Sequence, residues 1–410
     1  MRSRVIDVAV LALVLLSGAC ARHEERKEPL PTSAAPAPVA HATPAPPLEG
    51  EDFAADARLL VRVAACSGDE PLPAGLDAAV VKAHCDWLLP RMASYRKLYV
   101  GTAQPFLAGL RPKTAPTVVV YPFGGGDLLS ALTSYPDATE ITTLSLEHGG
   151  DPRPLRHFDK EQLAGGLARL RKAIDQLLTL DDSASESLMR VERGGIPGQL
   201  AFFLVGLAVH GQEPVSLRYF RLEPGGAIHY LSAAEIAEHD KARAKKLNTI
   251  WNAPDFSEAF SNLELQFRPA GGGPLRVHRH IAANLADAPL AKDPSVLQHL
   301  EAKGTVSGLI KASSYLLWTD DFKSISAYLL AHASFMISDS SGIPPWEATR
   351  AGFVQETYGD FGGAFIPAGK RGTDAFRELW KSQPHRNLGF RFGYSDVNKK
   401  PGLLVTRRAS

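Results

Sequence analysis

The chain has 410 residues, of which 45% are hydrophobic, 8% are aromatic and 22% are charged. This composition is that of an ordinary globular protein, and it excludes a wholly disordered chain, a fibrous repeat and a multi-span membrane protein. The 45 Lys and Arg residues nearly balance the 44 Asp and Glu residues, so no long-range field directs the chain toward nucleic acid.

The first twenty residues have the order of an export signal. Arg2 and Arg4 precede an apolar run over residues 8–16, and the small residues Ser17–Ala19 lead to Cys20. The run is shorter than the ~20 residues of a membrane span, which favours a secretory signal. The residues before Cys20 resemble the lipobox of bacterial lipoproteins, whose Cys is acylated and becomes the mature N-terminus. We expect residues 1–20 to be a signal peptide and Cys20 to be lipidated; the alternative is secretion without a lipid.

The residues after Cys20 predict where the anchored protein lies. Ala21 takes the place of the Asp that retains such lipoproteins in the inner membrane, which implies an outer-membrane anchor facing the periplasm. Residues 21–49 are polar and rich in proline, so we expect an extended, disordered tether there. Its prolines are Pro29, Pro31, Pro36, Pro38, Pro44, Pro46 and Pro47.

Residues 50–112 are expected to form a helical lead to the folded body. Two stretches with helical spacing of apolar residues contain Cys66 and Cys85, and a turn-like link joins them. In an exported protein, two remaining cysteines are most simply explained by a disulfide. We therefore predict a Cys66–Cys85 bridge between two helices, worth about 3 kcal/mol by loop closure.

The α/β core is predicted over residues 113–290 and begins with a β-branched run at Thr117–Tyr121. Gly124–Gly126 and a helix capped by Asp127 follow, and a second strand then ends at Glu147. This start resembles half of a nucleotide-binding Rossmann domain or a methyltransferase. The spaced glycine pattern is missing, and exported compartments hold little such cofactor, so we predict no cofactor. The alternative is a tight turn with a capping Asp.

The remaining core predicts a mixed α/β or α+β fold instead of a purely parallel sheet. Residues 200–209 are almost continuously apolar and suggest a central strand. Two β-ribbons are expected, one from residues 215–222 with 228–231 and the other from residues 263–267 with 275–281. His278 and His280 alternate on the latter ribbon, a spacing that suits a metal or cross-strand pairing with Glu264 and Gln266; no third ligand is evident, and no metal is predicted.

Polar residues follow three predicted strands and suggest a catalytic site. If the strands are parallel neighbours, Asp127, Glu147, His148 and His210 converge at one edge of the sheet. A carboxylate beside an imidazole supports general-base hydrolysis, so an exported hydrolase is one hypothesis. The alternative is that these side chains only cap and hydrogen-bond their loops.

Residues 291–410 are expected to form a helical and loop-rich part that packs on the core. Helical spacing is read from Val306 through Leu317 and again from Phe322 to Leu329. Alternating aromatic and small residues in the tail suggest edge strands or packed loops.

Four short segments resemble a family of exported bacterial proteins that has no established activity. They are Tyr121–Asp127, Leu146–Glu147, Lys311–Leu317 and Asp339–Pro344. The resemblance implies that Asp127, Lys311, Tyr315, Asp339 and Ser341 act together. Lys311 is then either a buried partner of an Asp, which locks the last third onto the core, or a desolvated base.

The sequence thus predicts a lipid-anchored envelope protein with a mixed α/β body. Binding of a small molecule or envelope partner, or a structural role, is the first hypothesis for that body. The exported hydrolase is the alternative, and a degenerate Rossmann domain fits both. The candidate catalytic residues are Asp127, Glu147, His148, His210, Lys311 and Asp339.

Overall fold

The structure, a computed structural model, describes residues 49–180, 185–243, 257–311, 316–340, 342–361, 369–393 and 402–409. The predicted signal peptide, the lipidated Cys20 and nearly all of the tether lie outside these residues, as do Tyr315 and Ser341. Across the described part of the chain, no helix is both long and apolar enough to span a membrane.

A ten-stranded mixed sheet organises the described residues. Its middle is parallel, and antiparallel strands flank it on both sides. The order across the sheet is β4 (Ile228–Tyr230), β3 (Gln212–Leu222), β5 (Asn262–Pro269), β6 (Arg276–Ala282), β2 (Glu140–Ser145), β1 (Val118–Pro122), β7 (Val306–Ile310), β8 (Ala333–Ser338), β10 (Gly402–Arg408) and β9 (Phe353–Gly359). Strands β6, β2, β1, β7 and β8 run parallel.

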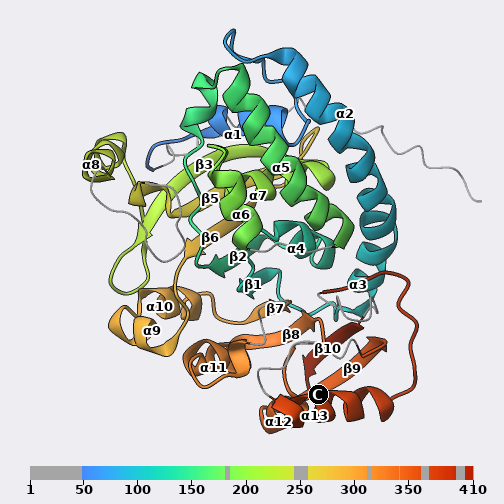
Figure 1. Cartoon of the computed structure of the whole chain (residues 1–410). Coiled ribbons are helices and arrows are strands. Elements are labelled where there is room, and N and C mark those ends of the chain that lie inside the picture. The colour runs from blue at the N-terminus through green and yellow to red at the C-terminus, as the bar shows by residue number, and fades with distance from the viewer. Residues whose placement is uncertain are drawn as a thin grey trace, which may run out of the picture. The chain divides into compact units, whose positions relative to one another are not determined.

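Two hydrophobic cores cover the two faces of this sheet. Successive residues of a strand point to opposite faces, so Val119 and Tyr121 join the first core and Val120 joins the second. Figure 1 shows the strands between two groups of helices. The first core contains α1 (Ala54–Ala64), α2 (Ala78–Tyr95), the π-helix Arg96–Ala103, α3 (Gln104–Leu110), α4 (Leu128–Ser134), α5 (Lys160–Leu180), α6 (Ser185–Glu192) and α7 (Gly198–Val209).

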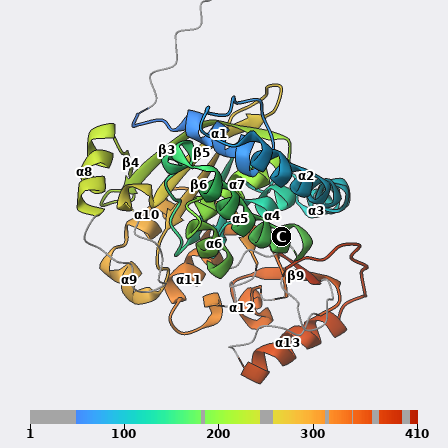
Figure 2. The ribbon, with the colours of Figure 1, turned by 45° about the horizontal axis from the view of Figure 1, so that its top comes forward.

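The second core is smaller and packs shorter helices on the other face. They are α9 (Asp287–Lys292), α10 (Ser295–Glu301), α11 (Lys323–His332) and α12 (Pro345–Arg350). Helix α8 (Ala233–Arg243) lies beyond β4, and α13 (Gly369–Lys381) lies with α12 near β9 (Figure 2). Single turns of 3₁₀-helix occur at Arg153–His157 and Glu258–Phe260.

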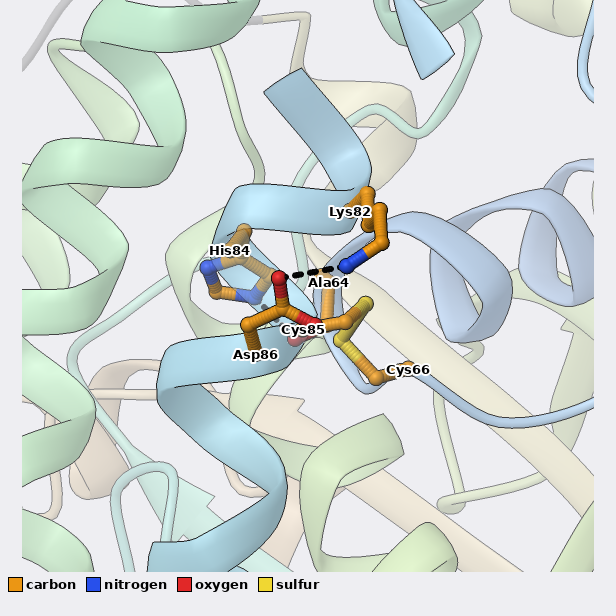
Figure 3. Close-up of a disulfide and its surroundings, with 6 residues drawn as sticks. All are labelled: Ala64, Cys66, Lys82, His84, Cys85 and Asp86. Carbon is orange, nitrogen blue, oxygen red and sulfur yellow. Dashed lines mark hydrogen bonds and ion pairs between the residues drawn. A yellow bond between two sulfur atoms is a disulfide. The ribbon is translucent and has the colours of Figure 1, made fainter. Parts of the chain in front are cut away.

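The predicted disulfide is present and joins α1 to α2. Cys66, two residues beyond the end of α1, is bonded to Cys85 within α2 (Figure 3). The neighbouring His84 makes a second link, because its ring nitrogen Nε2 lies 3.0 Å from the Ala64 carbonyl oxygen. Burial lowers the pKa of His84 to about 4, so the ring is neutral and donates this hydrogen bond.

Two elements were predicted with the wrong secondary structure: one predicted strand is a helix, and part of one predicted helix is a strand. Residues 200–209 belong to helix α7, whose residues are all buried because α1, α4 and α6 surround it above the sheet. An apolar run without polar interruption does not distinguish a fully buried helix from a strand. Residues 306–310 form strand β7 in place of a helix, buried over its whole length between β1 and β8. Both predicted ribbons are confirmed as antiparallel pairs, β3–β4 and β5–β6.

Candidate functional site

The strand order reverses direction at β1, which lies between β2 and β7. The connection from β1 to β2 runs through α4 in the first core, whereas that from β7 to β8 runs through α11 in the second. In open α/β sheets, ligands bind beyond the carboxyl ends of the strands at such a reversal. Asp127, Lys311 and Asp339 follow β1, β7 and β8, so the topology brings these predicted residues to one edge.

Asp127 and Lys311 form a buried ion pair at this edge. The side chain of Lys311 is 0% exposed, and its Nζ donates to Asp127 Oδ2 at 2.9 Å and to Ser130 Oγ at 2.6 Å. Asp127 also accepts from the Tyr121 hydroxyl at 2.9 Å and from the Ser130 backbone N–H at 3.1 Å. The carboxylate therefore caps α4, neutralises Lys311 and fixes Tyr121 at the same time.

The turn between β1 and Asp127 is tight and strained. Phe123 has φ +57°, a left-handed conformation that is rare for a bulky residue. A Cβ on Gly124 would lie 2.9 Å from the Tyr121 ring, and one on Gly126 would lie 3.0 Å from Leu188 and Phe202. These glycines let the chain reverse close to β1, which aims the Asp127 carboxylate back at β7.

Asp339 lies beside the Lys311 segment but is sealed by the tail of the chain. Its backbone N–H donates to the Ile310 carbonyl at 3.1 Å, and the residue is 1% exposed. Gly393 has φ +80°, and a Cβ there would lie 2.4 Å from Asp339 Oδ2. The backbone at Gly393 therefore covers Asp339 so closely that only glycine fits at position 393.

Glu147 and His148 follow β2 but turn toward β5. His148 Nδ1 lies 3.0 Å from Ser261 Oγ, next to the start of β5, and the half-buried Glu147 uses its carbonyl to accept from His280 Nε2 at 2.7 Å. Burial, and then the nearby His280, lowers the pKa of His148 to about 4. Burial and the charge of Glu147 raise the pKa of Glu192 to about 7.

His210 lies at the other edge of the sheet, so the expectation that it joins Asp127 is wrong. Its Nε2 lies 3.2 Å from Thr133 Oγ1, in the last turn of the helix whose first turn Asp127 caps. Burial lowers the pKa of His210 to about 4, with added repulsion from Arg276 at the start of β6 and from Arg96. The error arose because residues 200–209 are a helix that runs back across the sheet, so its end is not a strand end.

His278 and His280 do share a face, and they are packed as core residues. Both lie near Thr143 Oγ1, His278 Nε2 at 3.0 Å and His280 Nδ1 at 3.1 Å. Burial lowers both pKa values, that of His280 to about 4. Within the described residues, no three His, Cys, Asp or Glu side chains form a group that could hold a metal.

The predicted cross-strand partners of these histidines were wrong by one residue. His278 and His280 pair with Leu265 and Leu263, while Glu264 is opposite Arg279. Glu264 therefore faces the second core, where it belongs to a buried network of charged residues. The sequence did not predict this network. Arg279 bridges Glu264 at 2.8 Å and Glu140 at 2.6 Å, Arg218 also binds Glu264, and Lys303 also binds Glu140. Its one sequence signal is the alternation of charged residues with apolar ones in β3, β5 and β6.

No protein-family model, no curated protein and no solved structure matches this chain.

Proposed function

We propose that the protein is a lipid-anchored protein of the bacterial cell envelope whose α/β body acts by binding, without chemistry. The anchor rests on the resemblance of residues 1–20 to a lipoprotein signal, and the outer membrane on Ala21. The Pro-rich residues 21–49 would hold the body away from the lipid surface. The same exported family suggested by the motifs at Tyr121–Asp127 and Asp339–Pro344 is consistent with this location.

One observation carries the proposal of a non-catalytic body. Asp127 accepts three hydrogen bonds from Tyr121, Ser130 and Lys311, and both members of the ion pair are buried. General acid–base catalysis needs a group within reach of a substrate proton and with a pKa near the working pH. The Asp127 carboxylate is bonded by three groups of the protein itself, and His210 lies at the other edge of the sheet. This arrangement supports a structural ion pair that holds the last third of the chain on the core, and not a proton-transfer site.

The start of the body supports descent from a nucleotide-binding fold that no longer binds a nucleotide. Strand β1, the Gly124–Gly126 turn, α4 and β2 follow the order of a Rossmann half. In that fold a phosphate lies at the helix N-terminus, where the helix dipole favours an anion. Here the Asp127 carboxylate occupies this place and Lys311 neutralises it, which favours an uncharged or weakly charged ligand.

A thermal-shift experiment tests the binding function. Purified protein is mixed with lipid, glycan and small-molecule fractions of a bacterial cell envelope. Binding stabilises the folded state by mass action, so we expect one fraction to raise the melting temperature and to be recovered chemically unchanged. Chemical conversion of that fraction by the wild-type protein would instead establish catalysis.

Replacement of Cys20 tests the anchor. The wild-type chain should incorporate a palmitate analogue and fractionate with the outer membrane, because two or more acyl chains anchor a protein stably. Cys20→Ser should abolish the label and release the protein into the soluble fraction. As a control, Ala19→Ser keeps a small residue before Cys20 and should still be labelled. A labelled Cys20→Ser protein would contradict the proposal.

A further inference from the structure

Two carboxyl groups lie close together beside the start of helix α7. Glu147 lies just beyond the end of β2, Glu192 is the last residue of α6, and both are half-buried. Burial and the nearby charge of Glu147 raise the pKa of Glu192, and no cation lowers it. None of the ion pairs of the described residues includes either glutamate. Carboxyl groups that are partly buried without a positive partner favour a ligand that brings a positive charge.

Two contacts bring the surrounding elements together at this point. The Gly149 carbonyl accepts from the Leu200 N–H at 3.2 Å, which ties the segment after β2 to the first turn of α7. A Cβ on Gly198 would lie 2.3 Å from the Leu188 carbonyl oxygen, so the start of α7 packs directly on the backbone of α6. Figure 1 shows the two helices side by side. The segment after β2, the end of α6 and the start of α7 therefore meet.

Gln199 supplies a buried oxygen atom where these elements meet. His280 Nε2 lies 2.7 Å from the Glu147 carbonyl oxygen and donates to it, which leaves His280 Nδ1 as an acceptor. Gln199 Nε2 faces this Nδ1 at 3.4 Å, so the Gln199 amide and the Glu147 backbone lie against the same ring. Gln199 is 2% exposed, and its Oε1 has no hydrogen-bond partner in the part of the chain that the structure describes. A buried acceptor without a partner costs free energy, so this oxygen favours a ligand that donates a hydrogen bond.

We infer that Glu147, Glu192 and Gln199 form a binding site for a primary ammonium group. Two carboxylates and one amide oxygen match the three N–H donors of such a group, and the carboxylates balance its charge. A metal ion suits the site less, because the residues that the structure describes contain no group of three His, Cys, Asp or Glu side chains that could hold one. The inference rests on the proposed binding function and names the chemistry of its ligand. A small molecule with one ammonium group agrees with the weakly charged ligand favoured above.

The raised pKa of Glu192, about 7, makes ammonium binding depend on pH. A bound cation favours the ionised carboxylate, so binding below pH 7 releases a proton from Glu192. The rings of His148 and His280 are the other titratable groups beside Glu147, and they stay neutral because burial lowers their pKa values to about 4. The dissociation constant should therefore be about tenfold higher at pH 6 than at pH 8, which is the effect of one proton.

Ethanolamine is the probe for the site, and choline and ethylene glycol are its controls. Choline has the same charge but no N–H donor, and ethylene glycol has a hydroxyl group in place of the ammonium. For the full chain carrying Cys20→Ser, which removes the proposed lipid, we expect ethanolamine to raise the melting temperature more than equal concentrations of either control. Titration calorimetry at pH 8 and pH 6 then measures the dissociation constant and the released proton. Equal effects of ethanolamine and choline, a shift with calcium chloride but not with ethanolamine, or no binding of ethanolamine at any concentration would overturn the site.

Substitutions test which residues bind the probe. Glu192→Gln keeps the shape of the side chain but removes its charge, so it should weaken ethanolamine binding at pH 8 about tenfold and abolish the pH dependence. Gln199→Met should weaken binding and retain the pH dependence. Glu186→Gln is the matched control on the same helix, because the Glu186 side chain is 82% exposed and pairs with Arg190; it should bind like the wild type.

The stability of Glu192→Gln separates binding from folding. No ion pair is lost in this variant, so without a ligand it should melt at the wild-type temperature or above it. Equal ethanolamine binding by Glu192→Gln and the wild type would overturn the inference. An envelope fraction that raises the melting temperature of both proteins alike would leave the proposed binding function standing and would refute only this site.

Discussion

The Lys311 ammonium group lies in the interior, where it pairs with the buried carboxylate of Asp127. Removing one partner of a buried pair leaves an uncompensated charge. We expect Lys311→Met to lower the free energy of unfolding by about 3–5 kcal/mol. The double variant with Asp127→Asn should lose much less than the sum of the single losses, as measured by urea denaturation followed by circular dichroism.

An exposed pair provides the control for this prediction. Lys82 and Asp86 on α2 are bonded at 2.7 Å, with side chains 74% and 63% exposed (Figure 3). Surface pairs contribute little, so Lys82→Met should cost about 0.5 kcal/mol or less. Losses from Lys311→Met and Asp127→Asn that simply add would show that the two side chains do not stabilise each other.

For single residues, the sequence predicted which side chains matter better than it predicted the side chains they contact. Asp127 after a strand and three glycines is a recognisable helix cap, and a buried Lys–Asp pair was one of two readings for Lys311. The bonds of Tyr121 to Asp127 and of Ser130 to Lys311 were missed, because both depend on the path of the turn. Glu264 was assigned to the wrong face since a one-residue shift of register reverses every side chain of a strand.

Among the elements, α1 and α2 depend on a covalent link. The Cys66–Cys85 bridge joins residues 19 positions apart. Closing a loop of this size restricts the unfolded chain, so Cys66→Ala/Cys85→Ala should lower the free energy of unfolding by about 3 kcal/mol. Chemical denaturation with and without reductant checks this: the wild type should lose a similar amount in reductant, and the variant should lose nothing more. Equal stability of the wild type in both conditions would contradict it.

Predicting each element from its own residues succeeded where apolar and polar residues alternate and failed where the residues are almost continuously apolar. The β5–β6 ribbon alternates apolar with polar residues over much of its length, and its turn contains three glycines, so the local pattern identifies it. Helix α7 and strand β7 are buried on every side, and their residues carry no polar period. Which structure such a run adopts depends on what surrounds it, and that is a property of the tertiary fold.

Over the whole molecule, one sheet joins segments that are distant in the chain. The Asp127–Lys311 contact spans 184 positions, and β1 pairs with both β2 and β7. The mixed α/β class followed from the order of elements, but this interlocking did not, because parallel pairing between distant segments leaves no local signal. Charged and titratable groups gathered by such pairing are buried deeply, which makes the fold sensitive to acid.

Buried histidines are the main source of that sensitivity. Burial lowers the pKa of His84, His148, His210, His280 and His299 to about 4, and that of His278 well below 6.5. In the unfolded chain each has the ordinary pKa near 6.5. Between about pH 6.5 and 4 the unfolded state therefore binds protons that the folded state rejects, so stability is complete above this window and is lost as the pH falls through it.

Two acidic residues, Glu192 and Glu140, also change the pH dependence of stability, each in a different pH range. The pKa of Glu192 is raised to about 7, so between its ordinary pKa and pH 7 the folded state binds one proton that the unfolded state does not. This proton offsets the uptake by one histidine in the unfolded state. Burial alone would raise the pKa of Glu140, but Lys303 and Arg279 lower it to about 2, so the stability that Glu140 contributes is lost only at lower pH. We expect the free energy of unfolding, measured by urea titration from about pH 7.5 to 5, to fall by more than the ~1.4 kcal/mol per pH unit of one proton. His84→Gln should reduce the slope by about one proton's worth, because Gln does not titrate. A stability that is flat over this range would contradict the prediction, because it would mean that the folded and unfolded states bind the same number of protons.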